Sequence, residues 1–498
     1  MSEQTRRDLA QLLIPTLQWE PGQGFAAVRP LMDEALACGV GGFQLVGGEQ
    51  DTVRALAKEL QIKSRHPLLI AAELERGAGQ QFAGATGLPP VAAITATGDL
   101  ESLRRAARLT AREARTMGVN WNLAPVCDLD LLAENPILGT RAMGTEARRV
   151  GPLVQAWIEA CQAEGVLACA KRFPGTGRAT TDPFVELPVV DAPADQIKEL
   201  DLQPFRSAIA AGVASIMTSH IAFPSLDSSR VPATLSREML QWLLRQQFKY
   251  DNLIVSDAMT MAAVLQGRDA SAAAVLALRA GCDVLLAPGS LSTTLDALER
   301  ALDDGTLEPE RVRQSVRRRL KWAQWASPPN DWRRPSGADT AWGALLADRV
   351  LTVLHGPLPA LGTVTEVVVV NDDADVPGSD SVPANATTVL VEALRVGGHD
   401  ARLATAPTVA SGGPLVIAVF ADYLPLKQRT SVRADTIQRV HTLIEQAAAL
   451  QRGVVLIGLG DPRYAMQLAL EVPTILAWSG DRVMQQAAAR ALLRSRRG

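Results

Sequence analysis

A short stretch of the chain, after the apolar run at residues 166–170, gathers side chains that could carry chemistry. Lys171 and Arg172 end that run, a Pro-Gly loop follows, and Asp182 and Glu186 come a few residues later. Cations and carboxylates held this close can grip a polar substrate or move its protons. A loop that is costly to order and carries such residues is a typical place for function.

Further polar residues follow directly on apolar runs that are expected to be strands. They are Glu73, Asp128, the Ser219-His220 pair and Asp257. In a parallel barrel the carboxyl ends of the strands form the mouth, where active sites lie. Asp257 precedes a helical stretch, so it is either displayed at such a mouth or caps the next helix.

The elements that would position these residues alternate between strand and helix from about residue 10 to 325. The expected strands are Gly41–Val46, Leu68–Ala72, Asn120–Pro125, Val166–Ala170, Ala214–Thr218, Leu253–Ser256 and Asp283–Ala287. Continuous apolar strands between helices indicate a parallel sheet covered on both faces. Seven such units at roughly 30–50 residue spacing favour a (β/α)8 TIM-like barrel over an open sheet.

A chain of 498 residues is too long for one ordinary core, which predicts two domains. The barrel is expected over residues 1–325, a linker broken by prolines over 326–344, and a smaller parallel α/β sandwich over 345–498. Strands of the sandwich are expected at Glu366–Val370, Thr388–Glu392, Leu415–Phe420, Val454–Gly458 and Thr474–Trp478.

The composition, with 47% apolar and 21% charged residues, indicates a soluble globular protein. A net charge of −3 does not indicate binding to nucleic acid or to a membrane surface. No apolar run approaches the length of a membrane span. The N-terminus does not resemble a secretory signal. Five scattered cysteines have no metal-ligand spacing. We therefore expect reduced thiols, no metal or cofactor, and a cytoplasmic protein.

Four motifs resemble those of glycoside hydrolase family 3, which includes bacterial β-N-acetylhexosaminidases and β-glucosidases. Residues 170–188 resemble the family's K-H-F-P-G-H-G…D-x-H…L-P, and residues 70–90 resemble V-D-Q-E-G-G-R-V-Q-R-F…L-P-P. Residues 122–144 resemble N-x-A-P-V-x-D…N-P-x-I-G-x-R-S-F-G, and residues 217–261 resemble M-T-A-H-V…P-A-T-L-S…V-x-S-D-D-L-x-M. The resemblance covers most of the chain and implies a sugar-binding barrel.

The resemblance also implies roles for individual residues. Asp257 falls on the family's nucleophile, whose carboxylate attacks the anomeric carbon and forms a glycosyl ester. The implied substrate-binding residues are Glu73, Asp128, Arg141, Lys171, Arg172, His220 and Met261. Glu73 stands in place of an Asp and Arg172 in place of a His, which alters the contacts to the sugar. Arg172 would suit a carboxylate on the substrate, or an internal salt bridge to Glu73 or Asp182.

The general acid/base is where the chain departs most from the family. The family uses a His two residues after an Asp; here Asp182 is retained, but Phe184 stands at the position of the His. Glu186 is one replacement candidate. A carboxylate of the second domain is another, with loop candidates Asp372, Asp373, Asp375 and Asp400. The third option is that no acid exists.

The sequence thus predicts a retaining β-glycoside hydrolase, either β-N-acetylhexosaminidase-like or β-glucosidase-like, that acts on a small carbohydrate or glycoside as a monomer or homodimer. Asp257 is its predicted nucleophile, with Asp182 and Glu186 as the other catalytic candidates. The alternative is a catalytically silent family member that binds glycan or cell-wall fragments, because Phe184 cannot transfer a proton. A pure scaffold with a plugged barrel mouth is a third hypothesis.

Overall fold

The structure is a computed structural model that describes residues 3–326, 336–377, 388–409, 413–468 and 471–495. It divides into two compact units. The first consists of Met1–Thr86, Leu100–Asn135 and Ala142–Pro335. The second consists of Gly87–Asp99, Pro136–Arg141 and Ser336–Gly498. None of the described helices is both long enough and apolar enough to span a bilayer.

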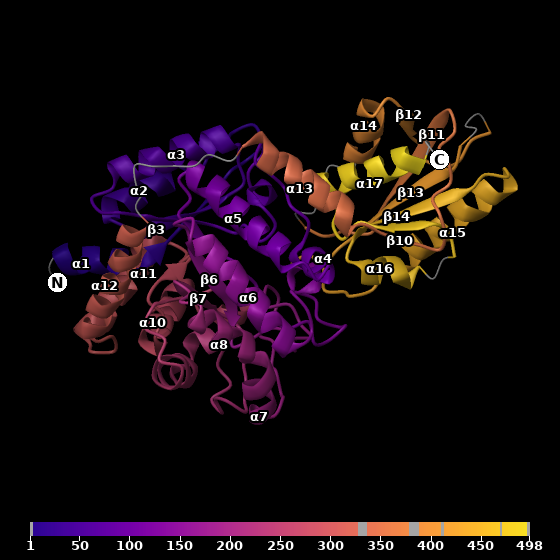
Figure 1. Ribbon diagram of the computed structural model, residues 1–498. Helices are drawn as coiled ribbons and strands as arrows, with labels where there is room; N and C mark the ends of the chain where they lie inside the picture. Colours follow the sequence, from indigo (N-terminus) through magenta and orange to yellow (C-terminus); the bar gives the residue numbers. More distant parts are fainter. Residues whose placement is uncertain (1–2, 327–335, 378–387, 410–412, 469–470, 496–498) are drawn as a thin grey trace. The chain divides into compact units, whose positions relative to one another are not determined.

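The first unit, drawn in indigo to salmon in Figure 1, is built on a ring of parallel strands. Seven of them pair in the order β2-β3-β4-β5-β6-β7-β8, and β1 pairs with β9. A bridge between Val255 and Val284 joins β8 to β9, so the ring closes and the predicted TIM-like α/β barrel is confirmed. The strands are β1 (Leu13–Ile14), β2 (Thr16–Gln18), β3 (Gly42–Val46), β4 (Leu69–Ala72), β5 (Trp121–Asn122), β6 (Leu167–Phe173), β7 (Ser215–Thr218), β8 (Leu253–Val255) and β9 (Leu285–Leu286).

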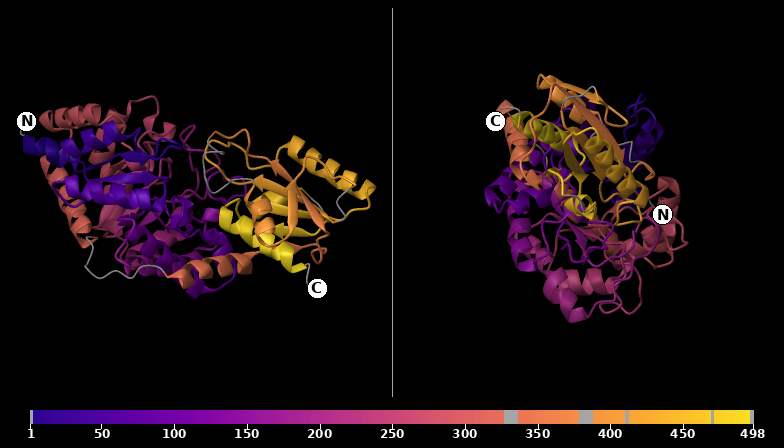
Figure 2. Two further views of the ribbon diagram at one scale, coloured as in Figure 1. Left: turned by 90° about the horizontal axis from the view of Figure 1, so that it is seen from above. Right: turned by 90° about the vertical axis from the view of Figure 1, so that its right-hand side faces the viewer.

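Helices cover the outside of this ring (Figure 2). The longer ones are α1 (Glu3–Ala10), α2 (Arg29–Cys38), α3 (Gln50–Lys63), α5 (Leu100–Thr116), α6 (Ala147–Gln162), α8 (Gln203–Ala210), the helical segment η5 (Glu238–Gln247), α10 (Ala270–Ala280), α11 (Leu291–Asp303) and α12 (Pro309–Trp325). A buried apolar cluster joins strand residues such as Leu69 and Trp121 to Trp322 of α12. Burial on both sides explains why the strands are continuously apolar.

The second unit contains a six-stranded sheet in the order β10-β15-β14-β13-β11-β12. Its strands are β10 (Thr352–Leu354), β11 (Val364–Asn371), β12 (Asp400–Leu403), β13 (Leu415–Ala421), β14 (Val454–Gly460) and β15 (Thr474–Leu476). The sheet is mixed rather than wholly parallel, because β10 runs antiparallel to β15. Figure 1 shows α14 (Val389–Val396) and α17 (Arg482–Arg494) on one face, and α15 (Ala434–Ala449) on the other.

Two expectations for the second unit differ from the structure. The predicted strand Thr388–Glu392 is wrong, because these residues begin α14, whose buried Val391 and Leu394 follow a helical spacing. A further helix, α13 (Gly337–Val350), begins inside the segment predicted as a linker. Ser336 and Asp339 form a capping box that starts this helix directly after the prolines. Residues 327–335 of the predicted linker lie outside the described residues.

Two short excursions from the barrel sequence pack within the second unit. They are Gly87–Asp99, which contains α4 (Val91–Ala96), and Pro136–Arg141, which contains η2 (Gly139–Arg141). Gly139 has a φ of +47°, and a Cβ there would lie 2.3 Å from Cδ2 of the Tyr423 ring. Only glycine therefore fits at this contact.

Candidate active site

Asp257 lies two residues past the carboxyl end of β8 and is only 8% exposed. Its Oδ1 accepts a 2.9 Å hydrogen bond from the amide of Ala258, and its Oδ2 forms an ion pair with Nε of Arg172. The next helix, α9 (Ala262–Leu265), starts only after Met261, so Asp257 caps no helix. Of the two sequence interpretations, display at the end of the strand is the one that fits.

The charges around Asp257 keep it ionised. Burial alone would raise its pKa, but the Arg172 guanidinium, with smaller contributions from His220 and the Ala258 amide, lowers the pKa to about 2. The carboxylate is thus present at any ordinary working pH. Because the Arg172 guanidinium already pairs with Asp257, it is less available to a substrate carboxylate than the sequence suggested.

Lys171, the residue before Arg172, is fully buried. Its Nζ lies 2.7 Å from Oε1 of Glu73 and 2.8 Å from Oε1 of Glu75. Arg172 also reaches towards Glu73, with 3.8 Å between Nη2 and Oε1. The internal salt bridge that the sequence suggested between Arg172 and Glu73 is therefore only the weaker of its contacts. Sequence reasoning missed Glu75, although its spacing of two residues from Glu73 was a visible signal.

Asp128 is 1% exposed and contacts both Arg172, near the end of β6, and the loop that follows this strand. Its carboxylate accepts hydrogen bonds from the Thr176 amide at 3.0 Å, the Thr176 hydroxyl at 2.7 Å and the Arg172 amide at 3.3 Å. Burial raises the pKa of Asp128, and these donors oppose the rise. Thr176 stands where the family pattern has a His, so here that position shapes the loop instead of facing a substrate.

His220 follows β7 and is buried. One ring nitrogen, Nδ1, lies 2.8 Å from the Thr234 hydroxyl, and the other, Nε2, lies 3.0 Å from the carbonyl oxygen of Ala258. Burial lowers the pKa of His220, which favours the neutral ring. His220 therefore links the segment just after Asp257 to Thr234. Met261, at the end of the same segment, is 4% exposed.

The loop that should carry the acid/base is held in place at several points. Asp182 is buried and accepts a 2.9 Å hydrogen bond from the amide of Phe184, and the Pro183 carbonyl accepts one from Ala263. Phe184 itself is 43% exposed, which is high for a large apolar side chain. Glu186 is exposed on the same loop.

Three of the four second-unit candidates have cationic partners of their own. Asp373 lies 2.6 Å from Lys427, and the fully buried Asp372 accepts a 3.0 Å hydrogen bond from the Arg433 amide. Asp375 is paired with Arg429. Asp400 opens strand β12 instead of lying in a loop.

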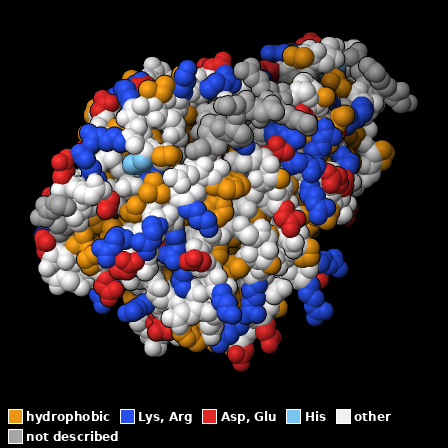
Figure 3. Space-filling model, turned by 60° about the vertical axis from the view of Figure 1, so that its left-hand side comes forward, with side chains coloured by type: hydrophobic (Ala, Val, Ile, Leu, Met, Phe, Trp, Pro, Cys, Tyr) orange, Lys and Arg blue, Asp and Glu red, His pale blue; other side chains and the backbone are white. Residues whose placement is uncertain are grey.

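Arg141 is also part of the second unit, where its guanidinium donates to the carbonyl of Ile137 at 3.2 Å. Among the described residues no group of His, Cys, Asp and Glu has the arrangement of a metal site. On the face drawn in Figure 3, acidic and basic side chains are intermixed rather than gathered by sign.

Comparisons with known proteins agree on one family. Residues 9–321 match the pattern described as the glycosyl hydrolase family 3 N terminal domain. The β-N-acetylglucosaminidase/β-glucosidase of Cellulomonas fimi is 35% identical over 290 residues, 56% of this chain and 51% of that protein. The β-hexosaminidase of Bordetella pertussis is 32% identical over 289 residues, 56% of this chain and 80% of that protein.

The solved structure of a family 3 β-N-acetylglucosaminidase from Paenibacillus sp. str. FPU-7 superimposes with a TM-score of 0.83 at 25% identity. That match covers 98% of this chain and 96% of the other. By contrast, the chain spans only about half the length of the Cellulomonas fimi relative. Together with the carboxylate after β8 and the Lys171-Arg172 pair near the end of β6, these matches show that the chain belongs to glycosyl hydrolase family 3.

Proposed function

We propose that this chain is a retaining β-glycoside hydrolase that works through a covalent glycosyl ester on Asp257. The observation that carries the proposal is a buried carboxylate at the end of β8 that Arg172 keeps ionised. Relatives named β-N-acetylglucosaminidase/β-glucosidase and β-hexosaminidase support a β-linked hexose or N-acetylhexosamine as the sugar.

Each residue has a part in this reaction. An Asp257 oxygen attacks the anomeric carbon, the bond to the leaving oxygen breaks, and water later cleaves the ester to release the sugar. Arg172 holds the nucleophile in position and ionised. Glu73 and Lys171 remain the proposed contacts to sugar hydroxyls, and Arg141 stays a proposed substrate contact.

Protonation of the leaving oxygen is the demanding step for this chain. Phe184 has no proton to give, and Asp182 is engaged in holding the loop. Glu186 is the remaining carboxyl on that loop and is exposed, so we propose it as the residual acid/base. Substrates with good leaving groups need no acid and should react first.

A mechanism-based label tests the proposal directly. The protein is incubated with 2,4-dinitrophenyl 2-deoxy-2-fluoro-β-glucoside and, in parallel, with the corresponding β-xyloside and β-glucuronide, and intact mass is recorded. We expect a mass increase of one fluorosugar, mapped by peptide sequencing to Asp257. A label on another residue, or no label together with no release of dinitrophenol from any unfluorinated analogue, contradicts the proposal.

The pH dependence follows from the low pKa of Asp257. Since the folded carboxylate titrates at about pH 2, kcat/KM for a dinitrophenyl glycoside should show no acidic limb from the nucleophile above about pH 3. The Arg172→Gln variant removes the main charge that lowers this pKa, so its acidic limb should move to higher pH. The comparison is a kcat/KM profile from pH 3 to 8, and identical profiles for the two proteins would contradict the role given to Arg172.

Installing a proton donor should help substrates that need one. We expect Phe184→His to raise kcat for a methyl or alkyl β-glycoside by about 10²-fold, the lower end of what general acids contribute, with little change for dinitrophenyl substrates. Val185→His is the matched control, because Val185 is the adjacent exposed residue. An equal gain in both variants, or none in Phe184→His, would contradict the assignment of position 184.

A second candidate function is a catalytically silent glycan-binding protein. It is favoured by the fact that both oxygens of Asp257 already have hydrogen-bond donors and that Phe184 replaces the proton donor. The two functions separate cleanly, because a silent barrel would bind sugars in calorimetry yet give neither label nor dinitrophenol.

A further inference from the structure

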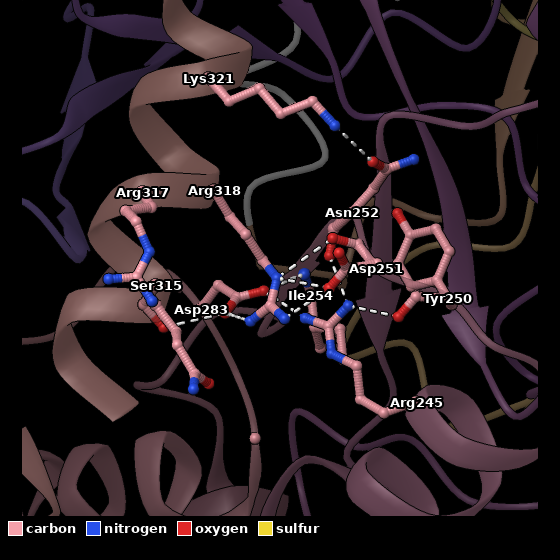
Figure 4. A network of polar contacts seen from close by, with 12 residues as sticks. Arg245, Tyr250, Asp251, Asn252, Ile254, Asp283, Ser315, Arg317, Arg318 and Lys321 are labelled. Carbon is pink, nitrogen blue, oxygen red and sulfur yellow. Dashed lines mark hydrogen bonds and ion pairs between the residues drawn. The ribbon is translucent and has the colours of Figure 1, made fainter. Parts of the chain in front are cut away.

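A basic cavity lies at the amino ends of strands β8 and β9, the end of the barrel opposite to Asp257. It has a volume of about 320 Å³. Six of its lining residues are Gln241, Arg245, Lys249, Asp251, Arg311 and Arg318, which come from η5, α12 and the segment before β8. Figure 4 shows Arg245 and Arg318 from opposite sides converging on the aspartates there.

The centre of this arrangement is Asp283, which is fully buried just before β9. Its carboxylate contacts Arg245 at 2.5 Å, Arg311 at 2.9 Å and Arg318 at 3.3 Å. One arginine would neutralise one buried carboxylate, so the cluster holds more positive charge than Asp283 requires.

The surplus of charge remains when the whole cavity wall is considered. Arg245, Lys249, Arg311 and Arg318 carry four positive charges, while Asp251 and the buried Asp283 carry two negative ones. Asp251 pairs with Arg318 at 2.6 Å and is otherwise exposed. Lys249 is exposed at the cavity and has no carboxylate partner among the described ion pairs. Two positive charges are therefore left without counter-charge.

We propose that this cavity binds a small oxyanion of the phosphate class. Guanidinium forks match the geometry of phosphate oxygens, and an ammonium group at the rim adds a point charge. The Gln241 and Gln314 amides supply neutral donors in the same wall. Burial, together with repulsion from Arg311 and Arg318, lowers the pKa of Arg245, and a bound anion would relieve that repulsion.

A neighbouring cavity indicates what the anion could be attached to. It has a volume of about 530 Å³ and shares Gln241, Arg311 and Gln314 with the first. Its remaining wall is not basic, since Arg237 and Arg279 are accompanied by three carboxylates, those of Asp304, Glu308 and Glu310. The pair of cavities thus suits a phosphorylated organic molecule, with the phosphate in the basic part.

Inorganic pyrophosphate is the probe for a first test, at constant ionic strength set with sodium chloride because exposed charges are screened by salt. Calorimetry on the full chain should give a Kd below ~1 mM. Lys249→Glu should weaken binding at least tenfold, since it reverses a charge that holds no part of the Asp283 network. Lys58→Glu, which changes another exposed lysine, on α3, should leave binding unchanged.

A variant that binds more tightly shows that weaker binding in Lys249→Glu does not result from misfolding. Asp251→Asn removes negative charge from the rim and should tighten pyrophosphate binding severalfold. No binding to the wild type at ~1 mM, or equal affinity in wild type and Lys249→Glu, would overturn the proposal. The test does not depend on glycosidase activity, so it can succeed or fail independently of the function proposed above.

Discussion

Asp257→Asn is expected to lower kcat for dinitrophenyl β-glycosides by ~10⁴-fold or more, the scale on which loss of an enzyme's nucleophile acts. The amide keeps the shape of the side chain and can still accept the hydrogen bond from Ala258, but it cannot attack the anomeric carbon. The measurement is dinitrophenol release under saturating substrate, with circular dichroism to show that the variant is folded.

The control for this variant is Asp296→Asn, which removes an exposed carboxylate of α11 that pairs only with surface Arg6 among the described ion pairs. It should keep full activity. If Asp257→Asn retains a tenth or more of the wild-type rate, Asp257 is not the nucleophile.

Azide sharpens the same experiment. In Asp257→Ala the space next to Arg172 is vacated, and azide can occupy it and attack the anomeric carbon from the face that Asp257 would have used. The product should be the α-glycosyl azide, with loss of dinitrophenolate. A β-glycosyl azide would instead mean that a second nucleophile had formed a covalent intermediate.

The second large effect is on stability. Asp283→Asn is expected to lower the free energy of unfolding by about 3–5 kcal/mol, because it leaves three arginines around a buried site without their carboxylate. Urea unfolding of the two proteins gives this difference directly. The control Glu310→Gln weakens exposed pairings with Arg313 and Arg317 on α12 and should leave the midpoint unchanged.

The pH dependence of that stability follows from the folded-state pKa of Asp283. Burial would raise it, but Arg245, Arg311 and Arg318 lower it to about 2, below the ordinary value of about 4. A lowered carboxyl pKa contributes stability above the unfolded-state pKa and loses it as the pH falls through the folded-state pKa. The wild type should therefore lose this contribution between about pH 4 and pH 2, and Asp283→Asn should lack this part of the acid transition.

The barrel was predictable because each strand is a short apolar run between helices, a pattern set by burial on both faces. The first strand was the exception. Pro15 splits it into β1, which pairs with β9, and β2, which pairs with β3, so neither piece is long enough to stand out from the helix before it. In the second unit, the run of β-branched residues that predicted a strand at 388–392 belongs to α14, because packing overrode propensity.

For the site, the motifs located Asp257, Lys171 and Arg172, but they did not predict which of the charged side chains form ion pairs with one another. The pairing of Arg172 with Asp257 joins residues 85 positions apart, and the strand order, in which β7 pairs with both β6 and β8, brings the ends of their strands close. Likewise, no local pattern marks Thr234 as the partner of His220. The spacing of residues along the sequence predicts which of them share one face of a helix or strand, whereas contacts between elements depend on the register of the strands around the whole ring.

The excursions Gly87–Asp99 and Pro136–Arg141 have a consequence for synthesis of the chain on the ribosome. Both emerge early, yet the surfaces against which they pack, including the Tyr423 ring that meets Gly139, are translated hundreds of residues later. The strands of the barrel can pair as they are synthesised, whereas the two excursions lack their packing partners until the second unit has been synthesised. A chain that ended before residue 423 would lack the Tyr423 ring, so the contact made by Gly139 forms only after most of the second unit has been synthesised.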